Sequence, residues 1–281
     1  MFKKIPAFVA GVCAVGLLAA CAGPGSAASP SNTSVGSEPS QYETAEVEIP
    51  PAFTVDTGHI QFAPPQPGDT IVILHTSMGD ITLRFFPDET PLTYENFVTH
   101  ARNGFYDGVI FHRVISDFMI QSGDPEGTGS GGDNIWGHPF GPEFSYELRH
   151  FRGALAMAHP GHPALMGSQF YIVQNDSLDP GTRAFFEEAL DNQEEVIGYD
   201  EEEGVFVTLD RVLPTDKINL YLELGGTPHL DWVMNPDGHT VFGHVVSGMD
   251  VVDAIAAVEV GAGHRPVDNV VIESVTVTVW E

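Results

Sequence analysis

Short apolar runs separated by turn residues recur along the chain from about residue 70, and most of them alternate with the period of two that is typical of β-strands. We expect strands at residues 71–76, 80–86, 109–115, 118–121, 154–158, 169–174, 240–246 and 270–280. The first two strands bracket Ser77-Met78-Gly79 and predict a β-hairpin.

Two segments keep helical spacing instead. The first has Thr90 at the expected N-cap and Pro91 in the first turn, and Gly104 ends it. The second covers residues 249–258. Periodicity alone therefore predicts a mostly β domain with two helices.

Residues 178–228 interrupt this pattern. They contain a helical segment at 182–190, a hairpin at 196–209 around an acidic turn, and a second helical segment at 215–224. The acidic turn at 200–203 lacks the spaced ligands of a known calcium loop, so a solvated turn is the simpler interpretation. Because a structureless loop of this length is uncommon in a compact domain, we expect a small folded appendage. We expect it to influence substrate choice without being required for the chemical step.

Arg113 is the outlier of the apolar segment 111–124. In a strand, Arg113 would share a face with Phe111 and Ile115, and Met119 and Gln121 would follow in the same phase. A buried guanidinium is costly unless a partner compensates it. A face with a cation, a thioether and an amide suits a small apolar ligand that carries a carbonyl. The alternative is a core strand with one surface arginine.

Four segments in this order resemble the cyclophilins, a family of peptidyl-prolyl cis–trans isomerases: residues 111–124, 151–158, 166–173 and 237–245. The resemblance runs from about residue 70 to 278, with one interruption. It implies a closed eight-stranded barrel capped by two helices, with an inserted α+β appendage. It also implies isomerase activity that needs no metal and no cofactor.

The resemblance assigns roles to individual residues. Arg113 corresponds to the catalytic arginine, and Gln121 to the amide that orients it. The expected substrate-binding residues are His112, Phe118, Met119, Ala158, Gln169, Tyr171, Leu230 and His239. Tyr171 stands where the family usually has phenylalanine, so its hydroxyl needs a partner or a water molecule. Two alternatives stay open: Phe118, Met119 and Leu230 could be plain core, and His239 could be a turn residue.

The N-terminus reads as an export signal. Lys3 and Lys4 precede an apolar stretch at 5–20 that is too short to span a bilayer comfortably. Leu18-Ala19-Ala20-Cys21 resembles the bacterial signal for lipid attachment at Cys21. We therefore expect a leader at 1–20 and a mature chain that is lipid-anchored on the extracytoplasmic face of the membrane. An ordinary cleaved secretory signal is the alternative.

Residues 21–68 form the expected flexible tether and lead-in, since their small and polar residues bury too little apolar surface to fold. The expected isomerase domain is 69–281. The formal net charge of −28 at pH 7 excludes a general affinity for nucleic acid. We expect a monomer whose partners are proline-containing unfolded or exported polypeptides. A chaperone or binding module that uses the same groove without turnover is the alternative, and a solute-binding lipoprotein does not fit the cyclophilin segments.

Overall fold

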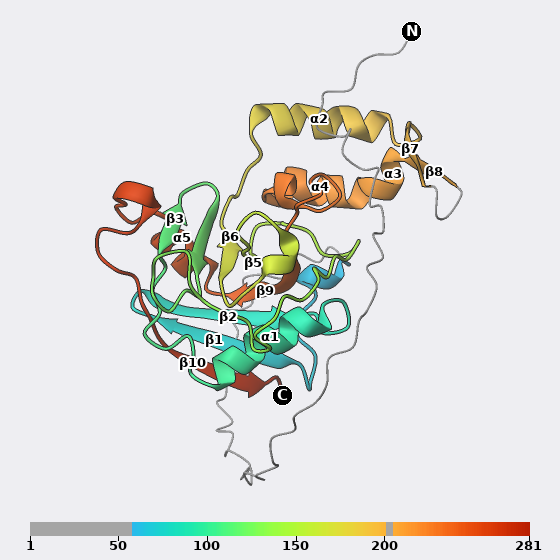
Figure 1. Ribbon diagram of the computed structural model, residues 1–281. Helices are drawn as coiled ribbons and strands as arrows, with labels where there is room; N and C mark the ends of the chain where they lie inside the picture. The colour runs from blue at the N-terminus through green and yellow to red at the C-terminus, as the bar shows by residue number, and fades with distance from the viewer. Residues whose placement is uncertain (1–57, 201–204) are drawn as a thin grey trace, which may run out of the picture.

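Eight strands form one antiparallel sheet in the order β10-β1-β2-β9-β5-β6-β4-β3. The computed structural model describes residues 58–200 and 205–281. The strands are β1 Thr70–Thr76, β2 Gly79–Phe85, β3 Arg113–Ile115, β4 Met119–Ser122, β5 Ala154–Met157, β6 Phe170–Val173, β9 Val241–Ser247 and β10 Ile272–Val279. The sheet curls into a half-barrel (Figure 1).

The prediction of eight strands is confirmed, but the prediction of a closed barrel is wrong. Strands β3 and β10 lie at opposite ends of the sheet order and share no ladder. A single bridge between Ile110 and Val271 joins the segments that precede them. The reason is local: β3 begins only at Arg113, so residues 109–112 make isolated backbone hydrogen bonds, such as Phe111 N to Val270 O at 2.9 Å.

The helices α1 (Pro91–Arg102) and α5 (Met249–Ala256) pack on the inner face of the sheet. Residues from both helices and all the long strands form an interior cluster, which includes Leu74, Ile81, Phe97, Phe170, Phe242 and Val252. Successive strand residues point to opposite faces, so the residues that alternate with this cluster point to the outer face of the sheet. The candidate site lies on that outer face.

Thr90 occupies the N-cap position of α1 as expected, but its side chain does not cap the helix. Its hydroxyl donates to Phe86 O at 3.1 Å. Glu143 from a distant loop supplies the cap, because its carboxylate accepts from Leu92 N at 3.0 Å and from Thr93 N at 2.7 Å. A carboxylate suits the unpaired N–H groups at a helix N-terminus.

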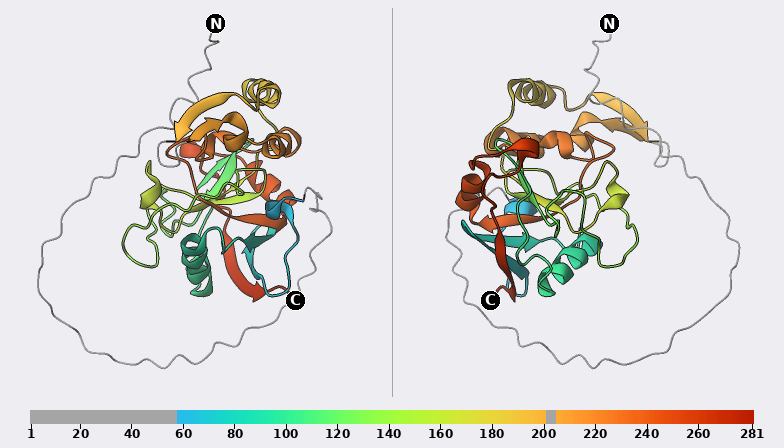
Figure 2. Two further views of the ribbon diagram at one scale, coloured as in Figure 1. Left: turned by 90° about the vertical axis from the view of Figure 1, so that its right-hand side faces the viewer. Right: turned by 60° about the vertical axis from the view of Figure 1, so that its left-hand side comes forward.

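The insertion contains α2 (Pro180–Asp191), β7 (Val196–Asp200), β8 (Val205–Thr208), α3 (Leu209–Val212) and α4 (Thr215–Leu224). Both expected helices and the expected hairpin are confirmed; the tip of the hairpin, 201–204, lies outside the described residues. In Figures 1 and 2 these elements lie together over one side of the sheet. The insertion cluster includes Phe62 and Phe151, Phe186 and Tyr221, and Val233. It therefore joins the insertion to residues on either side of it in sequence.

Part of the lead-in is docked against the domain. A 3₁₀ turn at Ile60–Phe62 buries the Gln61 side chain, whose amide donates to Arg149 O at 2.8 Å and accepts from Arg149 N at 3.0 Å. The expected leader, Cys21 and most of the tether lie outside the described residues. Among the residues described, no helix is both long and apolar enough to cross a bilayer.

Candidate active site on the outer face of the sheet

Four neighbouring strand positions bring the expected site residues into line. Arg113 pairs with Gln121, Gln121 with Tyr171, and Tyr171 with Ala156 across β3, β4, β6 and β5. Directly opposed residues share a face. Their strand neighbours Val114, Ile120 and Ile172 belong to the interior cluster, so the aligned residues lie on the outer face. The expectation that Phe111 shares this face is wrong: Phe111 precedes the strand and lies in the interior cluster.

The guanidinium of Arg113 is only partly buried, and its position is fixed by strand β4. Its Nη1 donates to Gln121 Oε1 at 3.2 Å and contacts the Met119 sulfur at 3.8 Å. Partial burial lowers the pKa of Arg113 from its ordinary value, but an arginine keeps its charge at neutral pH. Among residues 58–200 and 205–281, both of its hydrogen bonds use Nη1, which leaves Nε and Nη2 as donors for a ligand.

A chain of amides orients this arginine. Gln121 Nε2 donates to Gln169 Oε1 at 3.0 Å, and Gln169 Nε2 donates to Gly131 O at 2.8 Å. Each amide accepts through its oxygen and donates through its nitrogen, so the direction of the whole chain is set by the backbone carbonyl at its end. The Arg113 side chain is thereby linked to the glycine-rich loop at 124–132.

Asp124 holds that loop. Its carboxylate accepts from the backbone N–H groups of Glu126, Thr128, Gly129 and Gly131 at 2.6 to 3.2 Å. Burial alone would raise the pKa of Asp124, but these hydrogen bonds outweigh it and hold the pKa at about 2. Sequence reasoning did not single out Asp124, although it ends the segment that contains Arg113.

Apolar side chains border the arginine. They form the outer-face cluster, whose buried members are Phe86, Met119, Leu148, Ala154, Ala156, Tyr171, Val173 and Val241, and against which Ile115, Phe118, Ala158 and Leu230 pack. The Arg113 guanidinium carbon lies 5.8 Å from the centre of the Phe118 ring. The structure thus places Phe118 and Met119 beside Arg113, and Leu230 packs against the same cluster.

His239 also lies at this cluster. Its ring is edge-on to Tyr171, with centroids 5.3 Å apart, and it stacks on His159 at 4.0 Å. His239 Nδ1 is 2.9 Å from Met157 O, and its backbone N donates to Leu230 O at 3.0 Å. Burial lowers the pKa of His239 to about 3, with a further contribution from His159. The ring is therefore neutral at pH 7.

His112 is an expected site residue whose ring lies beside Gln169 rather than in the outer-face cluster. It is buried, and a Cβ at Gly129 would lie 3.5 Å from its Cδ2, so its ring packs under the glycine-rich loop. His229 was not among the expected substrate-binding residues, but its ring stacks on Phe118 with centroids 5.7 Å apart.

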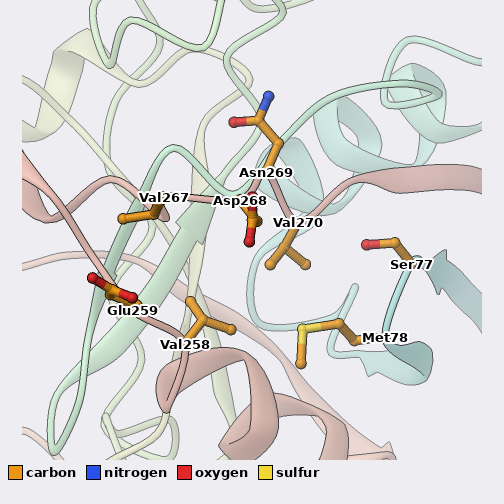
Figure 3. Close-up of a pocket in the computed structure, with 8 residues that line it drawn as sticks. All are labelled: Ser77, Met78, Val258, Glu259, Val267, Asp268, Asn269 and Val270. Carbon is orange, nitrogen blue, oxygen red and sulfur yellow. The ribbon is translucent and has the colours of Figure 1, made fainter.

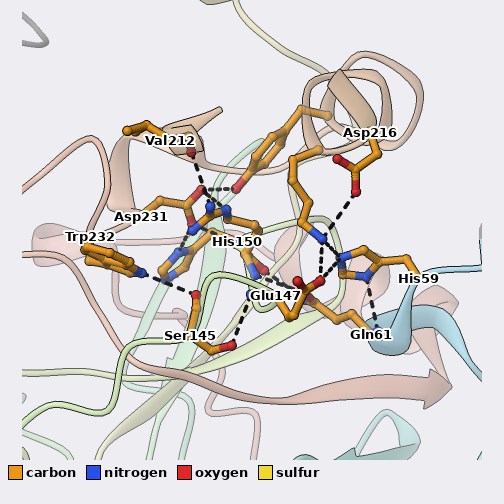
Figure 4. Close-up of polar contacts among 12 residues, drawn as sticks. His59, Gln61, Ser145, Glu147, His150, Val212, Asp216, Asp231 and Trp232 are labelled. Carbon is orange, nitrogen blue, oxygen red and sulfur yellow. Dashed lines mark hydrogen bonds and ion pairs between the residues drawn. The ribbon is translucent and has the colours of Figure 1, made fainter. Parts of the chain in front are cut away.

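The hydroxyl of Tyr171 finds its partner beneath the outer-face cluster. It lies 2.9 Å from His150 Nε2, and His150 Nδ1 lies 2.7 Å from Asp231 Oδ1. Figure 4 shows His150 and Asp231 side by side among other polar residues, and both are buried. Sequence reasoning missed both residues; the only signal was that the Tyr171 hydroxyl needed a partner.

A surface cavity of about 370 Å³ lies elsewhere (Figure 3). Its lining is Ser77, Met78, Val258, Glu259, Val267, Asp268, Asn269 and Val270, none of which is an expected site residue. In the part of the chain that the structure describes, no group of three or more His, Cys, Asp or Glu residues could hold a metal ion.

The curled sheet and its outer face match the class that the sequence segments suggested. The family model described as cyclophilin type peptidyl-prolyl cis-trans isomerase/CLD matches residues 71–277. A relative from Staphylococcus epidermidis, named as a peptidyl-prolyl cis-trans isomerase, is 43% identical over 212 residues, which are 75% of this chain and 93% of the relative. A Staphylococcus aureus relative with the same name is 42% identical over 212 residues, with the same 75% and 93% coverage.

Solved structures agree in fold. The crystal structure of a Cryptosporidium parvum cyclophilin type isomerase has a TM-score of 0.54 and 24% identity, over 76% of this chain and 99% of that chain. The chain therefore belongs to the cyclophilin-type peptidyl-prolyl cis-trans isomerases, and it is an isomerase enzyme.

Proposed function

We propose that this enzyme isomerises X–Pro bonds in exported polypeptides and that Arg113 is its catalytic residue. The bond before proline rotates over a barrier of about 18–20 kcal/mol because the amide is resonance-stabilised. Uncatalysed exchange takes tens to hundreds of seconds. The observation that carries the proposal is the partly buried guanidinium of Arg113, held through Nη1 at the edge of an apolar cluster.

Rotation makes the prolyl nitrogen pyramidal and gives it a lone pair. A donor from Arg113 aimed at that nitrogen stabilises the twisted state more than either planar state, which is the condition for catalysis. Gln121 keeps the guanidinium in place, while Phe118, Met119 and Leu230 receive the proline ring. No bond to the enzyme forms or breaks in this mechanism.

Proline-containing peptides are the proposed substrates. A second crystal structure of the Cryptosporidium parvum protein, with a TM-score of 0.52, was obtained in the presence of the dipeptide Ala-Pro. The test is a proline-isomerisation assay on a short X-Pro peptide with the purified chain. We expect acceleration proportional to enzyme concentration; a folded wild-type chain that binds the peptide without accelerating its exchange would contradict the proposal.

We also propose that the protein is exported and lipid-anchored through Cys21. The support is Leu18-Ala19-Ala20-Cys21 after a basic start and an apolar run. Two acyl chains on Cys21 would anchor the protein stably, whereas one would not. Labelling of cells with a radioactive fatty acid should mark the wild-type protein and leave Cys21→Ser unmarked. An unlabelled wild-type protein would rule out the anchor.

One observation favours the alternative, a client-binding module. The hairpin of the insertion exposes apolar side chains: 55% of Val196, 41% of Val205 and 70% of Phe206. An unfolded client could contact this surface while its proline occupies the site. Comparing the Phe206→Ser variant with the wild type on an unfolded protein and on a tetrapeptide separates the two functions. If the hairpin binds clients, Phe206→Ser should isomerise the unfolded protein more slowly and the tetrapeptide as fast as the wild type does.

A further inference from the structure

A chain of buried hydrogen bonds runs from the insertion to the outer-face cluster. Tyr221 of α4 donates its hydroxyl to Asp231 Oδ2 at 2.6 Å. Asp231 Oδ1 lies 2.7 Å from His150 Nδ1, and His150 Nε2 lies 2.9 Å from the Tyr171 hydroxyl. All four side chains are 4% exposed or less. The chain therefore links two elements about fifty positions apart through groups that water does not reach.

The Asp231 carboxylate sets the direction of the bonds that it makes. Asp231 can only accept, so His150 Nδ1 donates to it. In the neutral ring, Nε2 is then the acceptor and the Tyr171 hydroxyl is the donor to His150. The His150 backbone N–H also donates to Asp231 Oδ1 at 2.9 Å, and the fully buried Arg149 places Nε 4.0 Å from Asp231 Oδ2. The negative charge is thus opposed by a cation as well as hydrogen-bonded.

The backbone at the end of the insertion packs closely against His150. Thr227 N donates to His150 O at 2.8 Å. Gly226 has a φ of +130°, and a Cβ there would lie 2.3 Å from His150 O, so only glycine allows this close approach. Leu230 precedes Asp231 directly, and its N–H donates to Thr227 O at 2.9 Å. The network therefore fixes Leu230 as well as the ring of Tyr171.

We infer that Tyr221, Asp231 and His150 are positioning residues for the isomerase site: they hold Tyr171 in the floor of the proline pocket, and they make the insertion part of its support. The inference rests on the proposed function in one respect, namely that the outer-face cluster receives the proline ring. It differs from the sequence-based expectation that the insertion shapes substrate choice without supporting the site.

The first test is a double-mutant cycle on peptide affinity and kcat/KM, using the mature chain and an Ala-Pro tetrapeptide. Tyr221→Phe removes only the hydroxyl that α4 contributes. If the hydroxyl acts through Tyr171, we expect Tyr221→Phe to weaken affinity about threefold to tenfold in the wild type and by less than about twofold in a Tyr171→Phe background. A contribution to fold stability alone predicts the same change in both backgrounds.

Tyr94→Phe is the matched control. Tyr94 also loses one hydroxyl hydrogen bond, to Thr70 Oγ1 at 2.7 Å, but it packs on Phe85 away from the outer-face cluster. We expect unchanged peptide affinity and a smaller loss of thermal stability, because the Tyr94 side chain is only partly buried and its partner is uncharged. Asp231→Asn keeps the shape of the side chain and should show the same loss of peptide affinity, again dependent on Tyr171. This variant tests the inference if Tyr221→Phe folds poorly.

NMR supplies a readout that needs no substrate. Tyr221→Phe should shift the His150 ring nitrogen signals and the Tyr171 ring signals, and Tyr94→Phe should shift neither. Equal affinity losses in both backgrounds, or unmoved His150 and Tyr171 signals, would overturn the inference. A wild type that neither binds nor isomerises the peptide would instead contradict the proposed function. The NMR comparison would still test whether Tyr221 is coupled to Tyr171 through the hydrogen bonds.

Discussion

Arg113 is held by Gln121, which Gln169 holds in turn, and it ends a chain of hydrogen bonds that starts at the Gly131 carbonyl. We predict that Arg113→Ala lowers kcat/KM about 10²–10³-fold, because it removes one donor from the twisted state. Arg113→Lys should also be poor, since a flexible ammonium does not reproduce the planar fork. The measurement is the exchange rate of an X-Pro tetrapeptide.

The control for this prediction is Arg102→Ala, which removes an exposed arginine at the end of α1. It should leave turnover unchanged. Circular dichroism should show that all three variants are folded. Turnover close to that of the wild type in folded Arg113→Ala would remove Arg113 from the mechanism.

The Asp124 carboxylate is the second residue with a measurable consequence. Asp124→Asn places an amide N–H₂ among backbone donors, so at least one of them loses its acceptor. We predict a loss of about 1.5–3 kcal/mol in the free energy of unfolding. We also expect lower turnover, because the loop carries the Gly131 carbonyl that orients Gln169. Asp133→Asn, at the exposed position that directly follows this loop, is the control for urea denaturation and turnover.

Alternation along the strands predicted that Arg113 and Gln121 share a face, as they do in the sheet, whereas Tyr171 was expected at the site only through the resemblance to the cyclophilins. The sequence could not identify His150 and Asp231, which lie outside the strands and have no periodic signal. It also misplaced Phe111, because the strand begins two residues later than the apolar run does. The period of apolar residues predicts which side chains share a face of a strand. It does not predict which side chains in irregular segments will bond to them, because that depends on tertiary packing.

At the scale of elements, the insertion illustrates the same limit. Its helices followed from their own apolar spacing, but nothing in that spacing showed which surface they would cover. The structure places Tyr221 of α4 against Phe151 of the domain, with ring centroids 4.5 Å apart, and against Phe186 of α2 at 5.5 Å. The insertion and the domain therefore share one hydrophobic cluster.

We predict that Phe186→Ala destabilises the whole protein by about 3–5 kcal/mol, the usual cost of removing a buried aromatic ring. Because the insertion cluster includes Phe151 and Phe62, the domain and the insertion should unfold together. Urea titrations followed by tryptophan fluorescence and by circular dichroism should coincide.

Phe185→Ala is the neighbouring control, since the Phe185 side chain is only partly buried and should cost less. Two separate transitions in the wild type or in Phe186→Ala would show that the insertion folds as an independent unit. That outcome would contradict the shared cluster as an energetic link.

At the scale of the whole molecule, two electrostatic effects oppose each other on acidification. The net charge of −28 means that protonating carboxylates relieves repulsion. Buried histidines act in the other direction. Burial lowers the pKa of His244 and His239 to about 3 and that of His59 to about 4, and nearby cations add to the shift of His244 and His59. Ordinary carboxylates titrate near pH 4, so the histidines dominate between pH 7 and 5.

We predict that stability falls as the pH is lowered from 7 to 5. In that range the unfolded histidines, with an ordinary pKa near 6.5, bind protons that the folded rings cannot, so the unfolded state gains. The contribution of these histidines to the free energy of unfolding is complete above pH 6.5. It is lost as the pH falls toward about 3, the pKa of His244 and His239 in the folded state. For the fully buried His244 this loss amounts to about 2 kcal/mol at pH 5.

Urea denaturation at pH 7 and pH 5 measures the loss of stability. His244→Gln should reduce this loss, whereas His264→Gln on the surface should not. A wild type that is equally stable at both pH values, or more stable at pH 5, would show that the relief of repulsion among the carboxylates offsets or outweighs the buried histidines.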